Sequence, residues 1–323
     1  MLSLTKRSRL AAAAVGCSLV LAACSSSDDD TATPGASGSP AGAKLSGTIQ
    51  IDGSSTVAPL SEAAAEGFQE ENDGVKVVVG TSGTGGGFEK FCAGETDISD
   101  ASRPIKDKEA ATCKAKGIEF EEITVANDGL AVVVNKDNPI KCLTVEQLKK
   151  IWEPNSKVAN FKEVDPSFPD LPLKLFGPGT DSGTFDYFTD EINGEEGASR
   201  TDYQPSEDDN VIVQGVQGNK GGLGYFGLSY VEENPDALKA VAVDGGDGCV
   251  APSTETVLDG TYKPLGRPLF IYATTKTVER PEGLAFLEYY IENSDEIAEQ
   301  ALYVPLSDKQ KKEATAKIET LKG

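Results

Sequence analysis

A unit of strand, polar loop and helix recurs along the chain. In its first copy, residues 48–51 alternate between apolar and polar side chains, as a short half-buried strand does. The polar segment 52–56 follows, and Pro59 is well placed in the first turn of a helix. The predicted buried face of this helix consists of Leu60, Ala63, Ala64 and Phe68.

Two further copies of this unit are recognisable. Residues 75–79 form a β-branched run that predicts a strand, the Gly, Ser and Thr residues of 80–87 follow, and we expect a helix from Phe88. Residues 173–176 predict a third strand, which leads into the small and polar residues 177–184. The next helix is expected to bury Phe185, Phe188 and Ile192. Strands that alternate with helices predict an α/β fold with mostly parallel sheets.

Two other apolar segments are expected to pack in the interior and not to bind a ligand. Residues 221–227 are expected to form a buried strand and turn. Residues 281–301 carry apolar side chains at helical spacing and predict one packing helix.

The three polar loops together favour an anion site. The first N–H groups of a helix have no partner within the helix and lie at the positive end of its dipole. Small Gly, Ser and Thr residues let a ligand approach these groups and add hydroxyl donors. One such loop is weak evidence, because plain turns with capping residues look the same. Three of them between strands and helices favour the anion site. None is a nucleotide-binding P-loop, since no GxxxxGK[ST] occurs.

Composition and charge exclude several functions. The 323 residues include no His, which excludes the Ser-His-Asp triad, the Cys-His dyad and His-ligated zinc. A formal charge of −22 argues against nucleic acid, which is bound by clustered Lys and Arg, and against an anionic membrane surface. The 38% hydrophobic and 25% charged residues are ordinary for a globular chain that is long enough for two lobes.

The N-terminus is typical of an exported lipoprotein. Residues 1–23 combine three early basic residues with an apolar run, 10–20, that is too short to span a bilayer. The sequence Leu-Ala-Ala-Cys at 21–24 resembles a lipobox, in which the enzyme cuts before the Cys and the Cys is lipidated. We therefore expect a lipoprotein signal peptide at 1–23, followed by the lipidated Cys24 and a flexible linker at 24–44. The alternative is a plain signal peptide, in which Cys24 occurs by chance and carries no lipid. The mature protein would be anchored to the outer face of the cytoplasmic membrane, at the cell surface or in a periplasm.

Four cysteines remain after processing. Cys17 leaves with the signal peptide, so Cys92, Cys113, Cys142 and Cys249 are an even set in a compartment that permits disulfides. They allow three pairings. A metal site of four thiolates is the alternative, but no CxxC pair supports it.

Five motifs stand in the order found in one family. They are GSSTVAPL at 53–60, GTSGTGGGF at 80–88, DISDASRPI at 97–105, DSGTFDYF at 181–188 and YKPLGRPLFIY at 262–272. Over roughly residues 46–308 the chain resembles the PstS-type phosphate-binding lipoproteins, which are the substrate-binding components of phosphate ABC transporters.

This resemblance implies a two-lobed, periplasmic-binding-protein-like type II fold with a ligand cleft between the lobes. Lobe 1 is expected at 45–128 plus 272–323 and lobe 2 at 129–271, with crossing strands near 123–135 and 267–273. Among the three disulfide pairings we favour Cys92–Cys113 with Cys142–Cys249, because each bond then stays within one lobe.

The resemblance also implies the phosphate-binding residues, which donate from the three loops. They are Ser55 and Thr56, then Ser82 or Thr84, then Ser182, Gly183 and Thr184. An Arg that well-known members place beside the Ser-Gly-Thr of the third loop is missing here, since Pro178-Gly179 and Phe185 hold those positions. Arg103 is therefore our first candidate for the cation, and Arg200 a weaker one.

A carboxylate acceptor is expected as well. Phosphate near neutral pH carries a proton that sulfate lacks, so a buried carboxylate accepts from the first ion and repels the second. The family's Asp aligns with Ser102, which we keep as a contact, and Asp100 or Asp181 is left to accept the proton.

The sequence thus predicts a monomeric receptor without cofactors that closes on inorganic phosphate and delivers it to the permease subunits of an ABC importer. The same fold binding sulfate, molybdate or a phosphonate is the alternative. A hydrolase would need Ser55 or Ser182 as nucleophile, and neither motif has a His or a nearby Lys to act as base. An adhesin or sensor that retains the fold is a third class.

Overall fold

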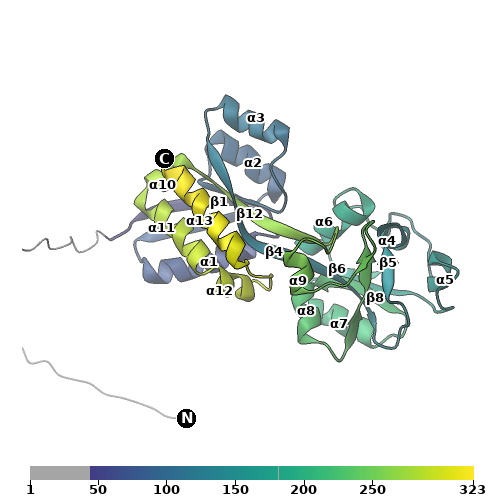
Figure 1. The fold of residues 1–323 in the computed structure, drawn as a ribbon. Helices are drawn as coiled ribbons and strands as arrows, with labels where there is room; N and C mark the ends of the chain where they lie inside the picture. Colours follow the sequence, from purple (N-terminus) through teal and green to yellow (C-terminus); the bar gives the residue numbers. More distant parts are fainter. Residues whose placement is uncertain (1–43, 181) are drawn as a thin grey trace, which may run out of the picture. The chain divides into compact units, whose positions relative to one another are not determined.

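The computed structural model describes residues 44–180 and 182–323 (Figure 1). The predicted signal peptide, Cys24 and the linker before Lys44 lie outside the described residues, and so does Asp181. Within the described part, no helix is long and apolar enough to cross a membrane.

The first lobe is built on a mixed sheet. Its parallel strands β1 (Gly47–Gly53), β2 (Val75–Thr81) and β3 (Ile98–Ala101) stand in the order β2-β1-β3. Next to β3 the sheet continues with β12 (Gly266–Thr274) and then β4 (Phe120–Asn135), and both of these pairings are antiparallel.

Helices cover both faces of this sheet (Figure 1). On one face, α2 (Gly83–Ala93) and α3 (Asp107–Ala115) pack around Phe270 and Tyr272 of β12. Alternate residues of β12 point to the opposite face and meet a second set of helices. These are α1 (Ala58–Glu71), α10 (Thr275–Glu279), α11 (Pro281–Glu292), α12 (Ser294–Gln300) and α13 (Asp308–Lys322).

The second lobe begins where β4 leaves β12. The C-terminal half of β4 pairs antiparallel with β8 (Gly222–Gly227) and β9 (Leu238–Ala240). Strands β6 (Lys174–Pro178) and β7 (Gln204–Ser206) continue from β8 in parallel. A small sheet lies apart from these strands and consists of β5 (Cys142–Thr144), β10 (Ala242–Asp244) and β11 (Cys249–Val250). The helical elements are α4 (Val145–Trp152), α5 (Phe161–Val164), α6 (Gly183–Phe188), the π-helix η1 (Thr189–Asn193), α7 (Asp209–Gln217), α8 (Leu228–Glu233) and α9 (Thr254–Leu258).

Each lobe has its own hydrophobic core. In the second lobe Trp152 packs edge-on against Phe188 and Tyr225, with ring centroids 5.7 and 4.9 Å away. In the first lobe, Phe68 of α1 meets Phe286 of α11 at 5.4 Å. Separate cores that share the long strand β4 confirm the predicted two-lobed α/β fold, while the exact lobe boundaries stay a prediction.

The prediction of mostly parallel sheets is only partly correct. The strands of the repeated unit are parallel, as their helical connections require. The two strands that join the lobes run in opposite directions through the molecule, and they therefore add antiparallel pairs to both sheets.

The favoured disulfide pairing is confirmed. Cys92 of α2 is bonded to Cys113 of α3, and Cys142 of β5 is bonded to Cys249 of β11. The first bond ties together the two helices on one face of lobe 1, and the second fastens the small sheet of lobe 2.

Two helix boundaries differ from the prediction. Helix α2 begins at Gly83 rather than at Phe88, so its N-terminal part includes glycines that are predicted to belong to the loop. One of them, Gly87, packs directly on β1, where a Cβ would lie 2.6 Å from the Cα of Gly53. The predicted C-terminal helix 281–301 is two helices, α11 and α12, which meet at Asn293.

Candidate functional site

A cavity of about 530 Å³ lies between the two lobes. Lobe 1 lines it with the loops that follow β1, β2 and β3, which are neighbours in one sheet. Lobe 2 lines it with α6 and the segment after α6, and β12 adds Arg267. Six residues expected at the site from lobe 1 face this cavity, namely Ser55, Thr56, Ser82, Thr84, Ser102 and Arg103.

The first loop is held from two sides. The Ser54 hydroxyl accepts a hydrogen bond from the backbone N–H of Thr56 at 3.2 Å, and the Tyr303 hydroxyl donates to the Thr56 carbonyl at 2.8 Å. Thr56 is buried, whereas Ser55 is exposed, and both precede the first turn of α1. These bonds fix the backbone at the point where the helix dipole is positive.

The loop after β2 contacts a carboxylate group of the neighbouring strand β1. Asp52, at the end of β1, accepts hydrogen bonds from the Ser82 hydroxyl and from the Lys90 ammonium. Burial raises the pKa of Asp52, but these two hydrogen bonds and the Lys90 charge outweigh it, so that the pKa is lowered overall. Ser82 is therefore oriented by an ionised partner at the N-terminus of α2.

The loops after β2 and β3 are joined by hydroxyl groups. The Thr84 and Ser102 hydroxyl oxygens lie 3.1 Å apart, and the backbone N–H of Ser102 donates to Thr84 Oγ1 at 3.3 Å. Both side chains are partly buried and line the cavity. The strand ends thus bring together residues that are far apart in the sequence.

From lobe 2, only part of the expected donor set faces the cavity. Gly183 lies directly against Thr56 across the cleft. The Ser182 hydroxyl instead caps α6 by accepting from the N–H of Thr184 at 3.2 Å, and neither of these two residues is among the described residues that line the cavity.

The two arginine candidates have different surroundings. Arg103 lines the cavity, but its guanidinium forms a bidentate ion pair with Glu109 at 2.8 and 2.9 Å. Arg200 lies elsewhere in lobe 2, where it pairs with Asp202 and donates to the carbonyls of Ile151 and Val158. The side chain of Arg200 therefore holds lobe 2 together and does not reach the cavity, contrary to that candidate role.

The carboxylate candidate Asp100 faces away from the cavity. It is fully buried on β3, its Oδ1 accepts from the Ser61 hydroxyl at 2.8 Å, and Ser61 contacts the hydroxyl of Tyr290 at 3.3 Å. Burial raises the pKa of Asp100 to about 7, despite that hydrogen bond. Its side chain points toward α1 and α11, so it is not placed to accept from a ligand in the cleft.

Asp186 of α6 does line the cavity. Burial and the negative charge of Glu196 raise the pKa of Asp186 to about 6, against the opposing charge of Arg267. Four further carboxylates of lobe 2 line the same cavity: Asp190, Glu191, Glu195 and Glu196. Lobe 2 thus presents mainly acceptors, and lobe 1 mainly hydroxyl and cationic donors.

Sequence reasoning missed Asp186, Lys106 and Arg267, all of which line the cavity. Asp186 and Arg267 lie within motifs that were already informative, DSGTFDYF and YKPLGRPLFIY. The acid that follows the Ser-Gly-Thr by two residues, and the cation on the return strand, were therefore available signals.

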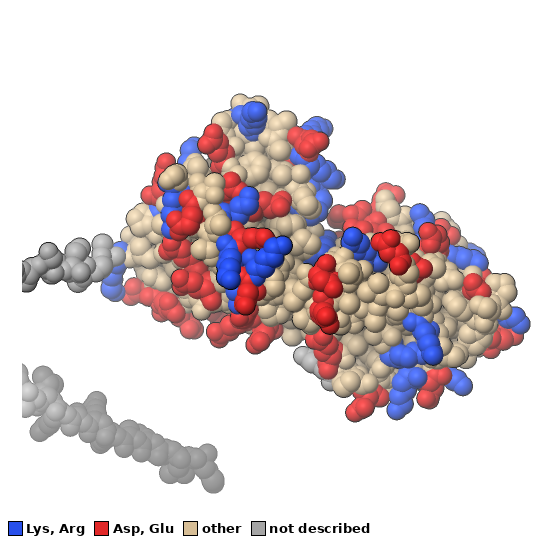
Figure 2. All heavy atoms as spheres, viewed as in Figure 1, with Lys and Arg blue, Asp and Glu red and all other residues tan. Residues whose placement is uncertain are grey.

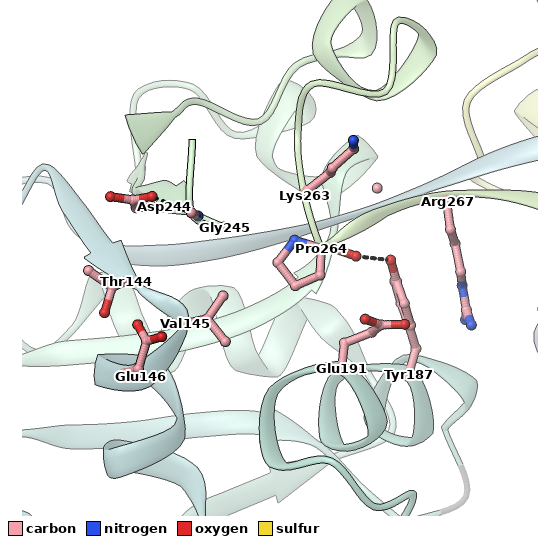
Figure 3. A pocket seen from close by; sticks show the side chains of 12 residues that line it. Thr144, Val145, Glu146, Tyr187, Glu191, Asp244, Gly245, Lys263, Pro264 and Arg267 are labelled. Atoms are coloured by element: carbon pink, nitrogen blue, oxygen red, sulfur yellow. Dashed lines mark hydrogen bonds between the residues drawn. The ribbon is translucent and has the colours of Figure 1, made fainter. Parts of the chain in front are cut away.

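A neighbouring cavity of about 660 Å³ lies in lobe 2 and shares Tyr187, Glu191 and Arg267 with the cleft (Figure 3). The Tyr187 hydroxyl donates to the carbonyl of Pro264 on its wall. On the face seen in Figure 2, acidic and basic side chains are both spread over the surface rather than gathered in one basic patch.

The fold and this cleft define a two-lobed solute-binding protein, and the comparisons agree. The family model described as a PBP superfamily domain matches residues 38–296. Protein SphX of Synechococcus elongatus is 47% identical over 277 residues, which cover 85% of this chain and 82% of SphX. Phosphate-binding protein PstS of Staphylococcus saprophyticus is 41% identical over 313 residues, with 96% and 93% covered.

Solved structures extend the match. A possible phosphate-binding protein from Planctomyces limnophilus is 48% identical with a TM-score of 0.83, over 86% of this chain and all of that one. A putative phosphate ABC transporter substrate-binding protein with bound phosphate, from Clostridium perfringens, is 30% identical with a TM-score of 0.56, over 81% of this chain and all of that one. The chain therefore belongs to the PstS family of phosphate-binding proteins within the PBP superfamily, as its motifs predict.

Proposed function

We propose that this protein binds inorganic phosphate between its two lobes and delivers it to a membrane ABC importer. The observation that carries the proposal is the cavity where three Ser/Thr loops of one lobe meet α6 of the other. The names of the relatives, phosphate-binding PstS and a phosphate transporter substrate-binding protein, support the same ligand.

The proposed donors come mainly from lobe 1. Ser55, Thr56, Ser82 and Thr84 supply hydroxyl groups beside the N-termini of α1 and α2, where the positive ends of the helix dipoles also favour an anion. Ser102, which is bonded to Thr84, completes this wall. A tetrahedral oxyanion accepts several such bonds at once, which a flat surface does not offer.

Asp186 is the proposed acceptor for the phosphate proton. With a pKa of about 6 it is ionised at neutral pH, and it faces the donors of lobe 1 across the cavity. A carboxylate at this place accepts a hydrogen bond from hydrogen phosphate and repels the unprotonated sulfate ion. It takes the role for which Asp100 is wrongly oriented.

The cellular context is part of the proposal. Members of this family are substrate-binding proteins of transporters, and we infer that this chain likewise binds and releases its ligand without catalysis. The expected signal peptide at 1–23 and lipidation of Cys24 would tether the exported monomer near the permease subunits by the linker at 24–44. Mass spectrometry of the membrane-extracted protein tests the lipid on Cys24.

Calorimetric titration with phosphate, after stripping of carried-over phosphate and with excess sulfate in a second run, tests the ligand. We expect one-to-one binding that sulfate does not compete away. Thr56→Val should weaken it by roughly 10-fold, because a buried hydroxyl contact is lost. The matched control Thr315→Val, on the exposed face of α13, should bind like the wild type.

Competition by sulfate would favour the alternative oxyanions, sulfate, molybdate or a phosphonate. Absence of binding to any of these anions by the folded, stripped protein would refute the proposal and leave an adhesin or sensor as the better hypothesis.

A further inference from the structure

The cleft needs a positive charge, and the cations that line it are not equivalent. Arg103 has most of its charge neutralised by the bidentate contact with Glu109. Lys106 is exposed at the N-cap of α3, where water competes for its ammonium group. Arg267 differs from both, because only 17% of its side chain is exposed and it sits where both lobes meet.

Arg267 touches three parts of the molecule. Its Nη1 donates to the carbonyl of Ser102 in lobe 1 at 2.9 Å. Its guanidinium lies over the Tyr187 ring of α6 in lobe 2, 3.4 Å from the ring centroid, and Figure 3 shows the two side chains next to each other. Nε and Nη2 lie 3.4 Å from Oδ2 of Asp128 on β4. The guanidinium is therefore fixed in direction by both lobes and by a crossing strand.

Tyr187 is itself anchored. Its hydroxyl donates to the carbonyl of Pro264, three residues before Arg267 on the same segment. The ring is buried, so the cation lies over an aromatic face with little water to screen it. This geometry holds the planar guanidinium at the edge of the cleft.

Asp128 neutralises Arg267 less completely than Glu109 neutralises Arg103. Both contacts to Asp128 are long, at 3.4 Å, and both use the same oxygen. Burial raises the pKa of Asp128, against the effect of Arg267. Positive charge therefore remains on Arg267 for a ligand.

Donors also remain. A guanidinium has five N–H groups, and three of those of Arg267 are used in its bonds to described residues. Arg267 lines the cavity, so a ligand bound there can compete for the N–H groups that these bonds leave unused.

We propose that Arg267 is the cation that offsets the charge of the bound tetrahedral oxyanion, and that Asp128 and Tyr187 are its positioning residues. This inference rests on the proposed function. The charge-compensating group is then carried by a strand that joins the lobes. The segment before α6 and the first turn of α6, where Pro178-Gly179 and Phe185 stand, do not carry it.

The test measures phosphate affinity by calorimetry for Arg267→Gln and Arg267→Lys. Gln removes the charge, and affinity should fall by roughly 10- to 150-fold. Lys keeps the positive charge but lacks the planar guanidinium with its several N–H donors, so it should recover part of the lost affinity. Arg280→Gln is the matched control: this Arg pairs with Asp97 on lobe 1, outside the cleft, and its loss should leave affinity unchanged.

Asp128 is tested by rescue. Asp128→Ala leaves Arg267 without its carboxylate and should weaken binding, whereas Asp128→Asn keeps an oxygen acceptor of the same shape and should restore most of the affinity. If Asp128 has a purely structural role, both variants should bind phosphate with the same affinity and should differ only in their unfolding temperatures.

The outcomes separate the two proposals. Failure of the wild type to bind phosphate refutes the proposed function itself. A wild type that binds, with Arg267→Gln within twofold of it, overturns the role of Arg267, as does an equal loss in Arg280→Gln. If Arg267→Gln does not fold, as judged by the fluorescence of Trp152, the chain's one Trp, then Arg267→Met decides, because it removes the charge but keeps an unbranched side chain against the Tyr187 ring. Wild-type affinity in a folded Arg267→Met variant overturns the proposal.

Discussion

Gly183→Ala separates closure of the lobes from the stability of each lobe. Gly183 begins α6 in lobe 2 and lies directly against Thr56 of lobe 1. A Cβ at this position would be 2.4 Å from Thr56 Oγ1 and 3.1 Å from both the backbone nitrogen and the Cα of Thr56. Rotation of the Thr56 side chain relieves the first contact but neither of the other two.

The expected cost falls on the closed state alone. Overpacking of this kind costs about 1–3 kcal/mol, and if only the closed form pays it, the apparent phosphate affinity drops by roughly 5- to 150-fold. The open form should not suffer, because Gly183 does not use a positive φ and Ala has the higher helix propensity. The unfolding temperature without ligand should therefore stay unchanged or rise.

Calorimetry for affinity and thermal unfolding without phosphate together test this reasoning. Gly227→Ala is a matched control, since a Cβ there would meet its nearest atoms at 3.7 and 3.8 Å, an ordinary contact distance, and it should match the wild type in both measurements. Wild-type affinity in Gly183→Ala would refute the claim that binding requires this contact. A lowered unfolding temperature without ligand would show that the contact belongs to the open state as well.

Three further predictions concern titration and cross-links. Burial raises the pKa of Asp100 to about 7, so the protein loses stability as the pH rises through about 7 and the buried carboxyl group ionises. In urea titrations at pH 5 and 8, Asp100→Asn should remove about 3 kcal/mol of this decline in the free energy of unfolding. In Asp186→Asn, sulfate should compete with phosphate about 10-fold better than in the wild type. The wild type should lose phosphate affinity below pH 6 as Asp186 is protonated, and the variant should lack this pH-dependent loss. Replacing Cys142 and Cys249 by Ser should lower the free energy of unfolding by about 2–5 kcal/mol, with little change in phosphate affinity, because this bond lies in the small sheet away from the cleft.

The loops of the site could be predicted because their signal is local. A strand, a run of small polar residues and a helix within twenty or so residues fix the place of Thr56 and Ser82 at a helix start, whatever the rest of the chain does. The first two predicted loops and the segment after β3 face one cavity because the parallel strands β1, β2 and β3 end at the same edge of a sheet, whereas the third predicted loop contributes, among its described residues, only Gly183 from lobe 2.

Side-chain direction and long-range pairing could not be predicted in this way. Asp100 belongs to the same motif as Ser102, but Asp100 lies within β3, on the face of Ile98 that packs against α1, whereas Ser102 follows the end of the strand and lines the cleft. Arg200 was a candidate cation from the sequence, but its guanidinium is held by Asp202 and two carbonyls. Arg267 reaches Ser102 only because β12 pairs with β3, which lies more than 160 residues earlier in the sequence.

The two walls of the cavity differ in what they offer a ligand. Lobe 1 and β12 contribute groups that donate hydrogen bonds, while the described cavity-lining residues of lobe 2 include five carboxylates that, when ionised, can only accept them. A fully ionised anion is attracted by the first wall and repelled by the second, so it gains little from closure. An oxyanion that keeps one proton can accept from lobe 1 and donate to lobe 2, and closure then adds contacts on both sides. This asymmetry favours hydrogen phosphate over sulfate even though the protein carries a formal charge of −22, because binding depends on the groups in the cleft and the distant surface charges are screened by salt within about 8–10 Å.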